Sequence, residues 1–191
     1  DPYNNESEVR DFIDWFSDIE IAKKIYVAGN HDTSIEKGLV TAKAFTDKGI
    51  IYLENETVEV DGIKVFGSPH TPQFGQWAFM KARNKLDRLW SLAIEEDVDI
   101  VITHGPPKGI LDLAEDRNGV MEFCGDKSLL NRVKEVKPRL VIFGHIHNSR
   151  NGIQNTGIRK INDLETVFSN AAVVTDGLRG ILTSNGNVIE I

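Results

Sequence analysis

The chain is poor in cysteine: Cys124 is its only one, so it cannot form a disulfide within itself. No run of charges beside Cys124 would lower the pKa of its thiol, and we interpret this residue as part of the packing. The sequence also lacks an apolar run of the ~18 residues that a membrane span requires, and a positively charged, then apolar, leader. These absences predict a cytoplasmic protein that does not associate with a membrane.

Positive charge is in the minority, because 22 lysine and arginine side chains face 29 aspartate and glutamate side chains. The net charge of −7 repels a polyanion, which argues against a long nucleic acid as the partner. Bound cations would reverse the charge locally, so a small phosphorylated substrate such as a nucleotide is compatible with it. With 191 residues and 40% apolar content, residues 1–191 are expected to form a single domain around one core. Nothing in the sequence indicates an oligomeric state.

Histidine is scarce as well, and the five histidines fall into four polar clusters that each follow an expected strand. The clusters cover residues 28–32, 67–72, 103–107 and 144–148. On an extended backbone, His145 and His147 would point to one side and Ile146 to the other. Two neutral imidazoles held side by side suit a divalent transition metal. The alternative is a pair of exposed or core histidines, which is the commoner interpretation of an isolated His-x-His.

The pattern of apolar residues predicts helices near residues 7–16, 39–47, 83–96 and 128–136, the first of them capped by Ser7. Strands are expected at residues 24–28, 50–53, 57–60, 63–66, 99–103, 140–143, 167–169, 172–175, 180–183 and 188–191. Strands alternate with helices early and follow one another late, which predicts an α/β domain whose sheet is first parallel and then antiparallel. Ligands of such sheets bind beyond the carboxyl ends of the strands, where every histidine is expected to lie.

A pair of divalent cations that cleaves a phosphate ester needs nitrogen and oxygen ligands, a bridging carboxylate and a proton donor. His104 and the two histidines of the last cluster are suitable nitrogen ligands, and Asn30 offers a neutral amide oxygen. His31 is placed to donate a proton. Asp32 is the nearest candidate for the bridging carboxylate, but it follows a turn and is interpreted as a brace of the loop, so no convincing bridging carboxylate is found in residues 1–191.

The order of GNHD at 29–32, THGPP at 103–107 and GHIH at 144–147 resembles the calcineurin-like metallophosphoesterases. The GSPHTP block at 67–72 resembles the branch of the metallophosphoesterase-domain-containing proteins of vertebrate brain, the 239FB-like proteins. The resemblance implies a four-layer α/β/β/α sandwich with mixed sheets and two divalent metal ions, which could be manganese, iron, zinc or nickel. It also implies a metal-dependent phosphoester hydrolase, either a phosphodiesterase or a phosphatase, that uses a metal-activated hydroxide on a small nucleotide-like substrate.

Carried over by position, the resemblance implies that one metal binds Asn30, His104 and His145, and that His147 binds the other. His31 would be the general acid, which protonates the departing alkoxide.

Other residues receive two interpretations each. By the resemblance, Asp32 orients His31; the alternative is that it braces the loop. His70 lines the substrate pocket or packs the loop. Asn170 lies near the metal site or is a turn residue. Three aromatic residues stack on a nucleobase or anchor the core: Phe74, Trp77 and Phe79.

The resemblance is incomplete at the start of the chain. The family opens with an Asp-x-His block and a Gly-Asp block on two strands, which supply the remaining ligands and the bridging carboxylate. Neither block occurs before the first expected helix, where the family has them. We therefore expect the native protein to be longer, with the N-terminal strands missing from this chain. The alternative is a catalytically silent nucleotide- or metal-binding module that retains the fold.

Overall fold

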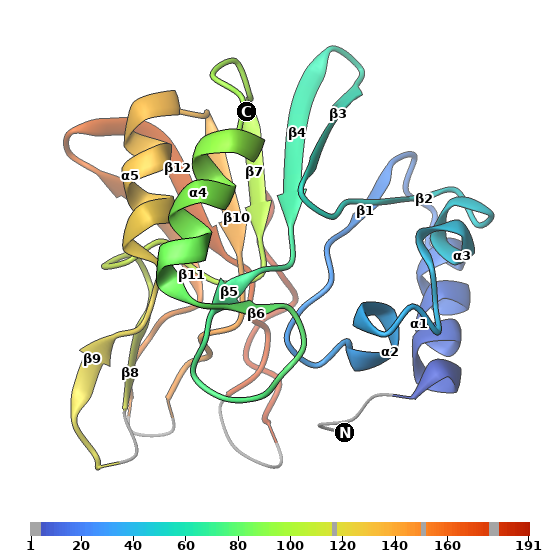
Figure 1. The fold of residues 1–191 in the computed structure, drawn as a ribbon, viewed down its shortest axis with the longest axis horizontal. Coiled ribbons are helices and arrows are strands. Elements are labelled where there is room, and N and C mark those ends of the chain that lie inside the picture. The colour runs from blue at the N-terminus through green and yellow to red at the C-terminus, as the bar shows by residue number, and fades with distance from the viewer. Residues whose placement is uncertain (1–4, 116–117, 150–151, 176–179) are drawn as a thin grey trace.

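A six-stranded mixed sheet forms the larger part of the protein (Figure 1). The structure, a computed structural model, describes residues 5–115, 118–149, 152–175 and 180–191. The sheet contains, in spatial order, β11 (Gly157–Ile161), β12 (Leu164–Asn170), β10 (Leu140–Phe143), β7 (Ile100–Thr103), β4 (Ile63–Ser68) and β3 (Glu56–Val60). The four central strands are parallel, and both edge strands are antiparallel to their neighbours. The central strands β7 and β10 are nearly continuous apolar runs, as expected for strands covered on both faces.

Two helices cover one face of this sheet: α4 (Arg83–Ala93) and α5 (Lys127–Val136). Each helix buries apolar residues four positions apart, Leu86 with Trp90 and Leu129 with Val133. These side chains pack with strand residues such as Phe168 in one core cluster. Fully burying a side chain of this size stabilises the fold by about 1.5–3 kcal/mol, so the helices are held mainly by this apolar contact.

A second, two-stranded parallel sheet pairs β1 (Lys24–Tyr26) with β2 (Ile50–Tyr52). Helices α1 (Glu6–Asp18) and α3 (Ala42–Thr46) pack on it through a separate core that includes Ile13 and Phe45. Helix α1 begins one residue before the predicted cap: Asn5, and not Ser7, is the N-cap. Its side chain accepts a hydrogen bond from the backbone N of Glu8 at 3.0 Å, and the Glu8 carboxylate accepts one in return. This reciprocal pair satisfies two backbone donors, which one serine hydroxyl cannot do.

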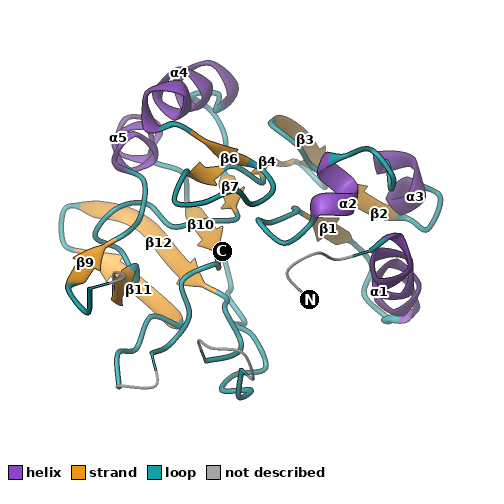
Figure 2. Cartoon of the chain, turned by 60° about the horizontal axis from the view of Figure 1, so that its bottom comes forward, coloured by secondary structure: helices purple, strands orange, loops and turns teal. Residues whose placement is uncertain are grey.

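The two sheets meet at Gly67 of β4. A Cβ atom at this position would lie 2.4 Å from Cβ of Leu53 and 3.0 Å from Cγ2 of Val27, so only glycine permits this approach. Leu53 follows β2 and Val27 follows β1. Helices, sheet, sheet and helices therefore succeed one another across the molecule (Figure 2), which is the predicted four-layer α/β/β/α order.

The C-terminal strand predictions were partly wrong. Residues 172–175 and 180–183 form only isolated bridges, between Val174 and Leu182 and between Asn148 and Thr175, and residues 188–191 are not in a strand. Apolar β-branched residues favour strands only where a partner strand is present to pack against, and these segments lack one among the described residues. The sheet instead gains β11, which the sequence analysis did not predict.

Several short elements were also not predicted. They are α2 (Thr33–Glu36), the paired β5 (Thr71–Pro72) and β6 (Met80–Lys81), and the hairpin of β8 (Leu113–Glu115) and β9 (Met121–Phe123). In the part of the chain that the structure describes, no helix has both the length and the apolar character needed to cross a membrane.

Candidate functional site

Three loops from different strands bring their side chains to one point. The Asn30 Oδ1 atom lies 2.6 Å from Nε2 of His104 and 3.1 Å from Nδ1 of His145. The centroids of the two imidazole rings are 4.7 Å apart, and Asn30 is 4% exposed. The loops follow β1, β7 and β10, so the meeting point lies beyond the carboxyl ends of these strands. His104 and His145 follow Asn30 in the chain by 74 and 115 positions, yet both are in direct contact with it.

Gly29 makes this contact possible. A Cβ atom at residue 29 would lie 2.5 Å from Cε1 of His104 and 2.6 Å from its Nδ1, so the imidazole occupies the space that any other side chain would need. The glycine carbonyl accepts a hydrogen bond from the backbone N of Asp32 at 3.0 Å, which closes the turn that presents Asn30. The first residue of the GNHD block is therefore required by packing.

His145 has a left-handed backbone, with φ of 70°. Strand β10 ends at Phe143, and the backbone N of Ile146 donates to the carbonyl of Gly144 at 2.8 Å. The prediction that His145 and His147 lie on an extended strand was therefore wrong, because His145 is the centre of a tight turn beyond the strand and His147 follows that turn. A left-handed non-glycine residue costs about 1–3 kcal/mol and persists only where the surrounding contacts impose it.

Buried asparagine amides hold this turn in place. Asn170, the last residue of β12, donates from Nδ2 to the carbonyl of Ile146 at 2.9 Å and to that of Leu111 at 3.1 Å. Asn155 donates from Nδ2 to the carbonyl of His147 at 2.9 Å. Both asparagines are almost fully buried. Asn170 ends a strand and also closes its own turn, since its Oδ1 accepts a hydrogen bond from the backbone N of Ala172 at 2.9 Å. These contacts correspond to the turn interpretation, and a place of Asn170 near a metal stays a prediction.

Burial lowers the pKa of both central histidines. For His145 the pKa falls to about 4, because of burial first and the neighbouring imidazoles second. The pKa of His104 lies well below its usual value for the same reasons. Both rings are therefore neutral at pH 7, which is the form that binds metals. Two neutral imidazole nitrogens and a neutral amide oxygen fit a divalent transition-metal cation.

His31 and His147 lie at the edge of this cluster. Together with His145 they line a hollow with a volume of about 400 Å³. The His31 ring is exposed and lies 5.0 Å, between centroids, from the Trp77 ring. Partial burial lowers the pKa of His31, while the adjacent carboxylate of Asp32 acts in the opposite direction. Nδ1 of His147 lies 3.4 Å from the carbonyl oxygen of Thr175.

The Asp32 carboxylate faces its own loop. Oδ2 accepts a hydrogen bond from the backbone N of Gly29 at 2.6 Å, and the side chain is also hydrogen-bonded to Tyr26. Burial, with this carboxylate, raises the pKa of the Tyr26 hydroxyl, so Tyr26 stays a donor. These contacts correspond to the bracing role considered for Asp32, and its orienting of His31 stays a prediction.

A second hollow of about 420 Å³ lies on another side of His145. Phe74 lines it, is 54% exposed, and has its ring centroid 5.4 Å from that of His145. Arg83 and Cys124 also line it, and the Arg83 guanidinium donates to the carbonyls of Gly125 and Cys124. Sequence reasoning missed Arg83, because an arginine at the start of a surface helix is unremarkable. Burial raises the pKa of the Cys124 thiol, so it is held in the unreactive neutral form.

A family model for calcineurin-like phosphoesterases matches residues 1–149. The chain belongs to this family. It is 34% identical over 193 residues to metallophosphoesterase domain-containing protein 1 of Homo sapiens, an alignment that covers 88% of this chain and 56% of the human protein. A UPF0046 protein of Caenorhabditis elegans is 31% identical over 81% of this chain and 53% of its own length. The chain thus spans about half the length of these relatives.

A solved crystal structure shares the fold of this calcineurin-like phosphoesterase. It superposes with a TM-score of 0.62 at 16% sequence identity and covers 87% of this chain and 63% of its own. The predicted family and the predicted fold class are therefore confirmed.

The predicted site residues of this calcineurin-like chain differ in how the structure places them. Asn30, His104 and His145 are in contact, and His31 and His147 share a hollow with His145. Their ligand and acid roles stay predictions. Within the described ranges, no group of three or more His, Cys, Asp or Glu side chains is arranged to hold a metal, since the central cluster has two histidines and an amide.

His70 lies apart from the two hollows. It is 7% exposed, and its ring nitrogens contact Nδ2 of Asn55 at 3.2 Å and the carbonyl of Phe79 at 3.0 Å. These contacts correspond to the loop-packing alternative, and substrate binding by His70 stays a prediction. Phe79 is also buried, in the core of the smaller sheet, whereas Phe74 and Trp77 border the site.

Proposed function

We propose that the protein is a metal-dependent phosphoester hydrolase, a phosphodiesterase or phosphatase that acts on a small nucleotide-like substrate. The observation that carries the proposal is the contact of Asn30 Oδ1 with the ring nitrogens of His104 and His145 at 2.6 and 3.1 Å. Family membership supports phosphoester hydrolysis in general. The contact of three uncharged potential metal ligands from distant loops supports this activity for the present chain.

Asn30, His104 and His145 would hold one divalent cation, and His147 would contribute to a second. When bound, the two cations, which could be manganese, iron, zinc or nickel, would activate water and neutralise charge on the phosphate. Because the three central ligands are uncharged, they leave the positive charge available to an anionic substrate. Burial keeps the two central imidazoles unprotonated and ready to bind.

His31 would act as the general acid toward the leaving oxygen. Its ring is exposed, lines the hollow that contains His145 and His147, and lies against Trp77, which limits its movement. A proton on this ring can therefore reach a group bound in the hollow. Asp32 fixes the turn that carries His31 through its bond from Gly29. It thus acts by positioning, whether or not it also orients the ring.

The exposed ring of Phe74 is the reason for proposing a nucleotide-like substrate. This exposed ring stands beside His145 at the wall of the 420 Å³ hollow, where a base or another flat group can stack on it. The net charge of −7 disfavours a long nucleic acid, so the proposed partner is a small phosphorylated molecule. A cytoplasmic location is proposed because the single cysteine indicates no oxidising compartment.

Hydrolysis of bis(p-nitrophenyl) phosphate in the presence of manganese tests the proposal. We expect kcat/KM to fall at least about 100-fold in H104A and about 100-fold in H31A, the range seen for acid–base and electrostatic groups. The exposed K134A variant on α5 is the control and should keep the wild-type rate. Wild-type rates in H104A would refute the assignment.

A catalytically silent nucleotide- or metal-binding module is the second candidate. Its lack of catalysis, and not its binding of a metal, is what the absence, within the described residues, of any group of three His, Cys, Asp or Glu side chains that could hold a metal favours. Titration calorimetry with manganese and a mononucleotide distinguishes the two. Binding without turnover of the chromogenic ester would select the silent module, and turnover that depends on His31 would select the hydrolase.

A further inference from the structure

A groove beside helix α4 lies outside both hollows of the histidine site. Its volume is about 610 Å³. We call it the α4 groove and define it by six of its lining residues, Asn55, Lys81, Lys85, Arg88, Leu89 and Leu92. None of its lining residues lines either hollow at the histidines. It is therefore a separate feature of the surface.

The α4 groove is basic in an acidic protein. Lys81, Lys85 and Arg88 line it, and no carboxylate does, although the chain has a net charge of −7. Within the described ranges, none of these three cations forms an ion pair, whereas lysines elsewhere, such as Lys64 and Lys48, pair with aspartates. The groove therefore concentrates unneutralised positive charge.

The acidic groups nearest in sequence do not line the groove. Glu54 adjoins Asn55, and its carboxylate accepts a hydrogen bond from the Tyr52 hydroxyl at 2.8 Å and, among the described residues, forms no ion pair with the groove cations. Asp87, on α4 itself, lines a different hollow together with Arg83. The positive charge thus remains open to a ligand from outside the chain.

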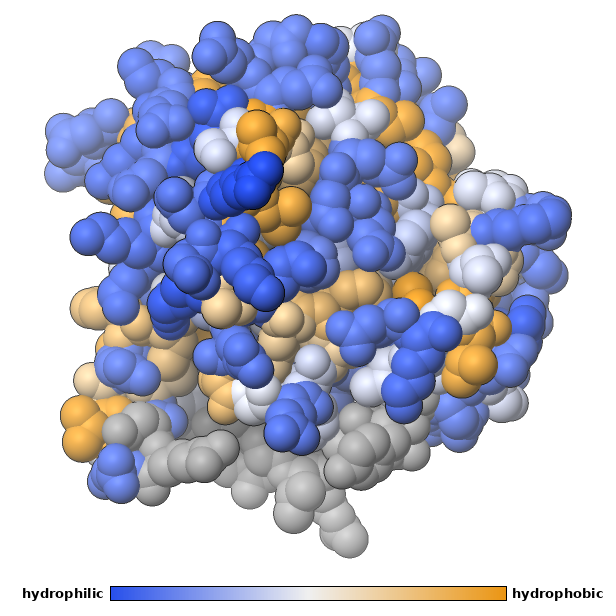
Figure 3. Space-filling view, in the orientation of Figure 1, coloured by the Kyte–Doolittle hydropathy of each residue, from blue (hydrophilic) through white to orange (hydrophobic). Residues whose placement is uncertain are grey.

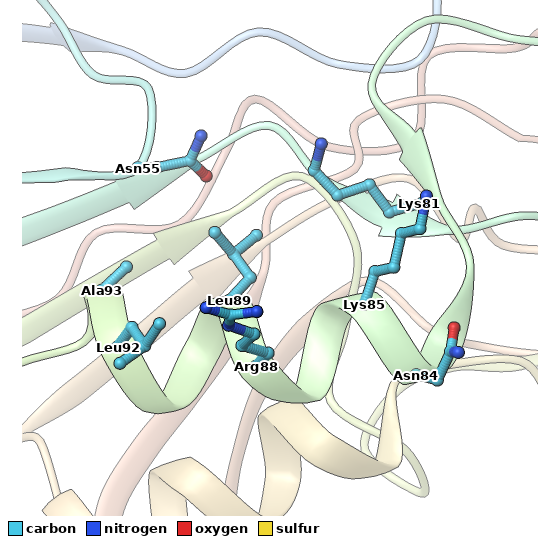
Figure 4. A pocket seen from close by; sticks show the side chains of 8 residues that line it. All are labelled: Asn55, Lys81, Asn84, Lys85, Arg88, Leu89, Leu92 and Ala93. Atoms are coloured by element: carbon cyan, nitrogen blue, oxygen red, sulfur yellow. The ribbon is translucent and has the colours of Figure 1, made fainter.

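The groove has a basic end and an apolar end. Figure 4 shows the side chains of Lys81 and Lys85 at one end and those of Leu92 and Ala93 at the other, with Asn55 opposite the helix. Leu92 is 73% exposed. In the space-filling view of Figure 3, apolar atoms reach the surface over α4 beside strongly hydrophilic ones. A ligand that fits must be acidic at one end and apolar at the other.

The positions of Lys85 and Leu92 on α4 set the distance between the basic end and the apolar end of the groove. Lys85 and Leu92 are separated along α4 by about 10 Å, at ~1.5 Å per residue. An extended peptide covers that distance in about three residues, at ~3.3 Å each. A peptide can thus place carboxylates over the lysines and a large apolar side chain over Leu92 at the same time.

We propose that the α4 groove is a docking site for an acidic segment of a partner protein. Its carboxylates bind Lys81, Lys85 and Arg88, and a leucine-like side chain about three positions away packs on Leu89 and Leu92. Nucleic acid fits less well, because the apolar end of the groove, at Leu89 and Leu92, has no group that binds a phosphate. The occupant is therefore a peptide with both features.

Selection from a random twelve-residue peptide display library on the full chain tests this docking site. We expect the enriched peptides to contain two or more acidic residues and a leucine, isoleucine or phenylalanine about three positions from them. Their affinity, measured by fluorescence anisotropy, should fall with rising salt. It should fall about ten-fold or more in K85E/R88E, and about five-fold in L92S.

The matched control reverses two exposed lysines away from the groove, in K134E/K160E on α5 and β11, and makes the same change in net charge. It should bind the peptide within about two-fold of the wild type, which separates local contacts from overall charge. Hydrolysis of the chromogenic ester should be the same in K85E/R88E as in the wild type. If the wild type does not hydrolyse the ester at all, that result contradicts the proposed function and says nothing about the groove.

Three outcomes would overturn the docking site. One is a selection without enrichment of acidic peptides, and another is equal binding by K85E/R88E and the wild type. The third is a different occupant, detected as single-stranded RNA that binds more tightly than the peptide and is lost in K85E/R88E, or as self-association of the chain that K85E/R88E abolishes.

Discussion

The backbone of Gly29 lies directly against the imidazole of His104, and a Cβ atom at residue 29 would be 2.5 Å from Cε1 of that ring. The glycine thus defines where His104 can be, and the position of His104 defines its 2.6 Å contact with Asn30. Gly29, which has no side chain, therefore helps to determine the geometry of the candidate site.

The first prediction concerns this pair. G29A should lower the free energy of unfolding by about 1–3 kcal/mol, because the new methyl group overlaps the ring. The same substitution in an H104A background should cost less by at least about 1 kcal/mol, because the space is then free. Urea unfolding of the four proteins of this cycle measures the difference. Equal costs in both backgrounds would show that the contact does not form.

Asn170 provides the second prediction. N170A removes the donors to the carbonyls of Ile146 and Leu111, and each buried carbonyl left without a partner costs about 1–3 kcal/mol. For the two carbonyls together we expect a loss of about 2–6 kcal/mol in the free energy of unfolding, and a lower affinity for manganese, since the turn that carries His145 loses its support. N187A is the control, because Asn187 also bonds to β12, through Ser169 and Asn170, but does not touch the turn. A larger effect on manganese binding in N187A than in N170A would contradict the supporting role.

Phe74 provides the third prediction. F74A should raise KM for a nucleotide-like ester by about five- to ten-fold with little change in kcat, since stacking of one ring contributes about 0.5–1.5 kcal/mol. Because the side chain is 54% exposed, the free energy of unfolding should hardly change. The control is F123A on β9, which is 50% exposed and does not line the hollow. An unchanged KM in F74A would remove the stacking argument.

The fourth prediction concerns His70 and pH. Burial lowers its pKa below the usual value, with Lys81 acting in the same direction and the Phe79 carbonyl, Glu54 and Glu36 in the opposite one. Between the lowered pKa and about 6.5 the unfolded chain binds a proton that the folded chain does not, so stability falls as pH drops through this window.

The H70N variant lacks this titration. The loss of unfolding free energy between about pH 7.5 and about pH 5.5 should therefore be smaller in H70N than in the wild type. Other histidines titrate equally in both proteins, so the difference isolates residue 70. A pH dependence that is identical in the two proteins would contradict the burial of a neutral His70.

Much of the site could be predicted because its residues lie in short sequence motifs. The clusters at 29–32, 103–107 and 144–147 identify Asn30, His104 and His145, and each follows an apolar run long enough to indicate a strand. Parallel strands bring their carboxyl ends to one edge, so the meeting of His104 and His145, which follow β7 and β10 of one sheet, follows from the pattern. Asn30 follows β1 of the other sheet, and the packing of the two sheets brings it to this point. The direction of Asp32 could not be predicted in this way, since an aspartate after a turn can face either the loop or the site.

The sequence by itself determined which side chains are available, the order of most strands and helices up to residue 143, and the family, because these depend on local periodicity and on motifs of a few residues. Only the tertiary structure decided the left-handed turn at His145, its support by Asn170 and the separate α4 groove. These features arise where segments far apart in the chain press on one another, and no local pattern records such long-range contacts.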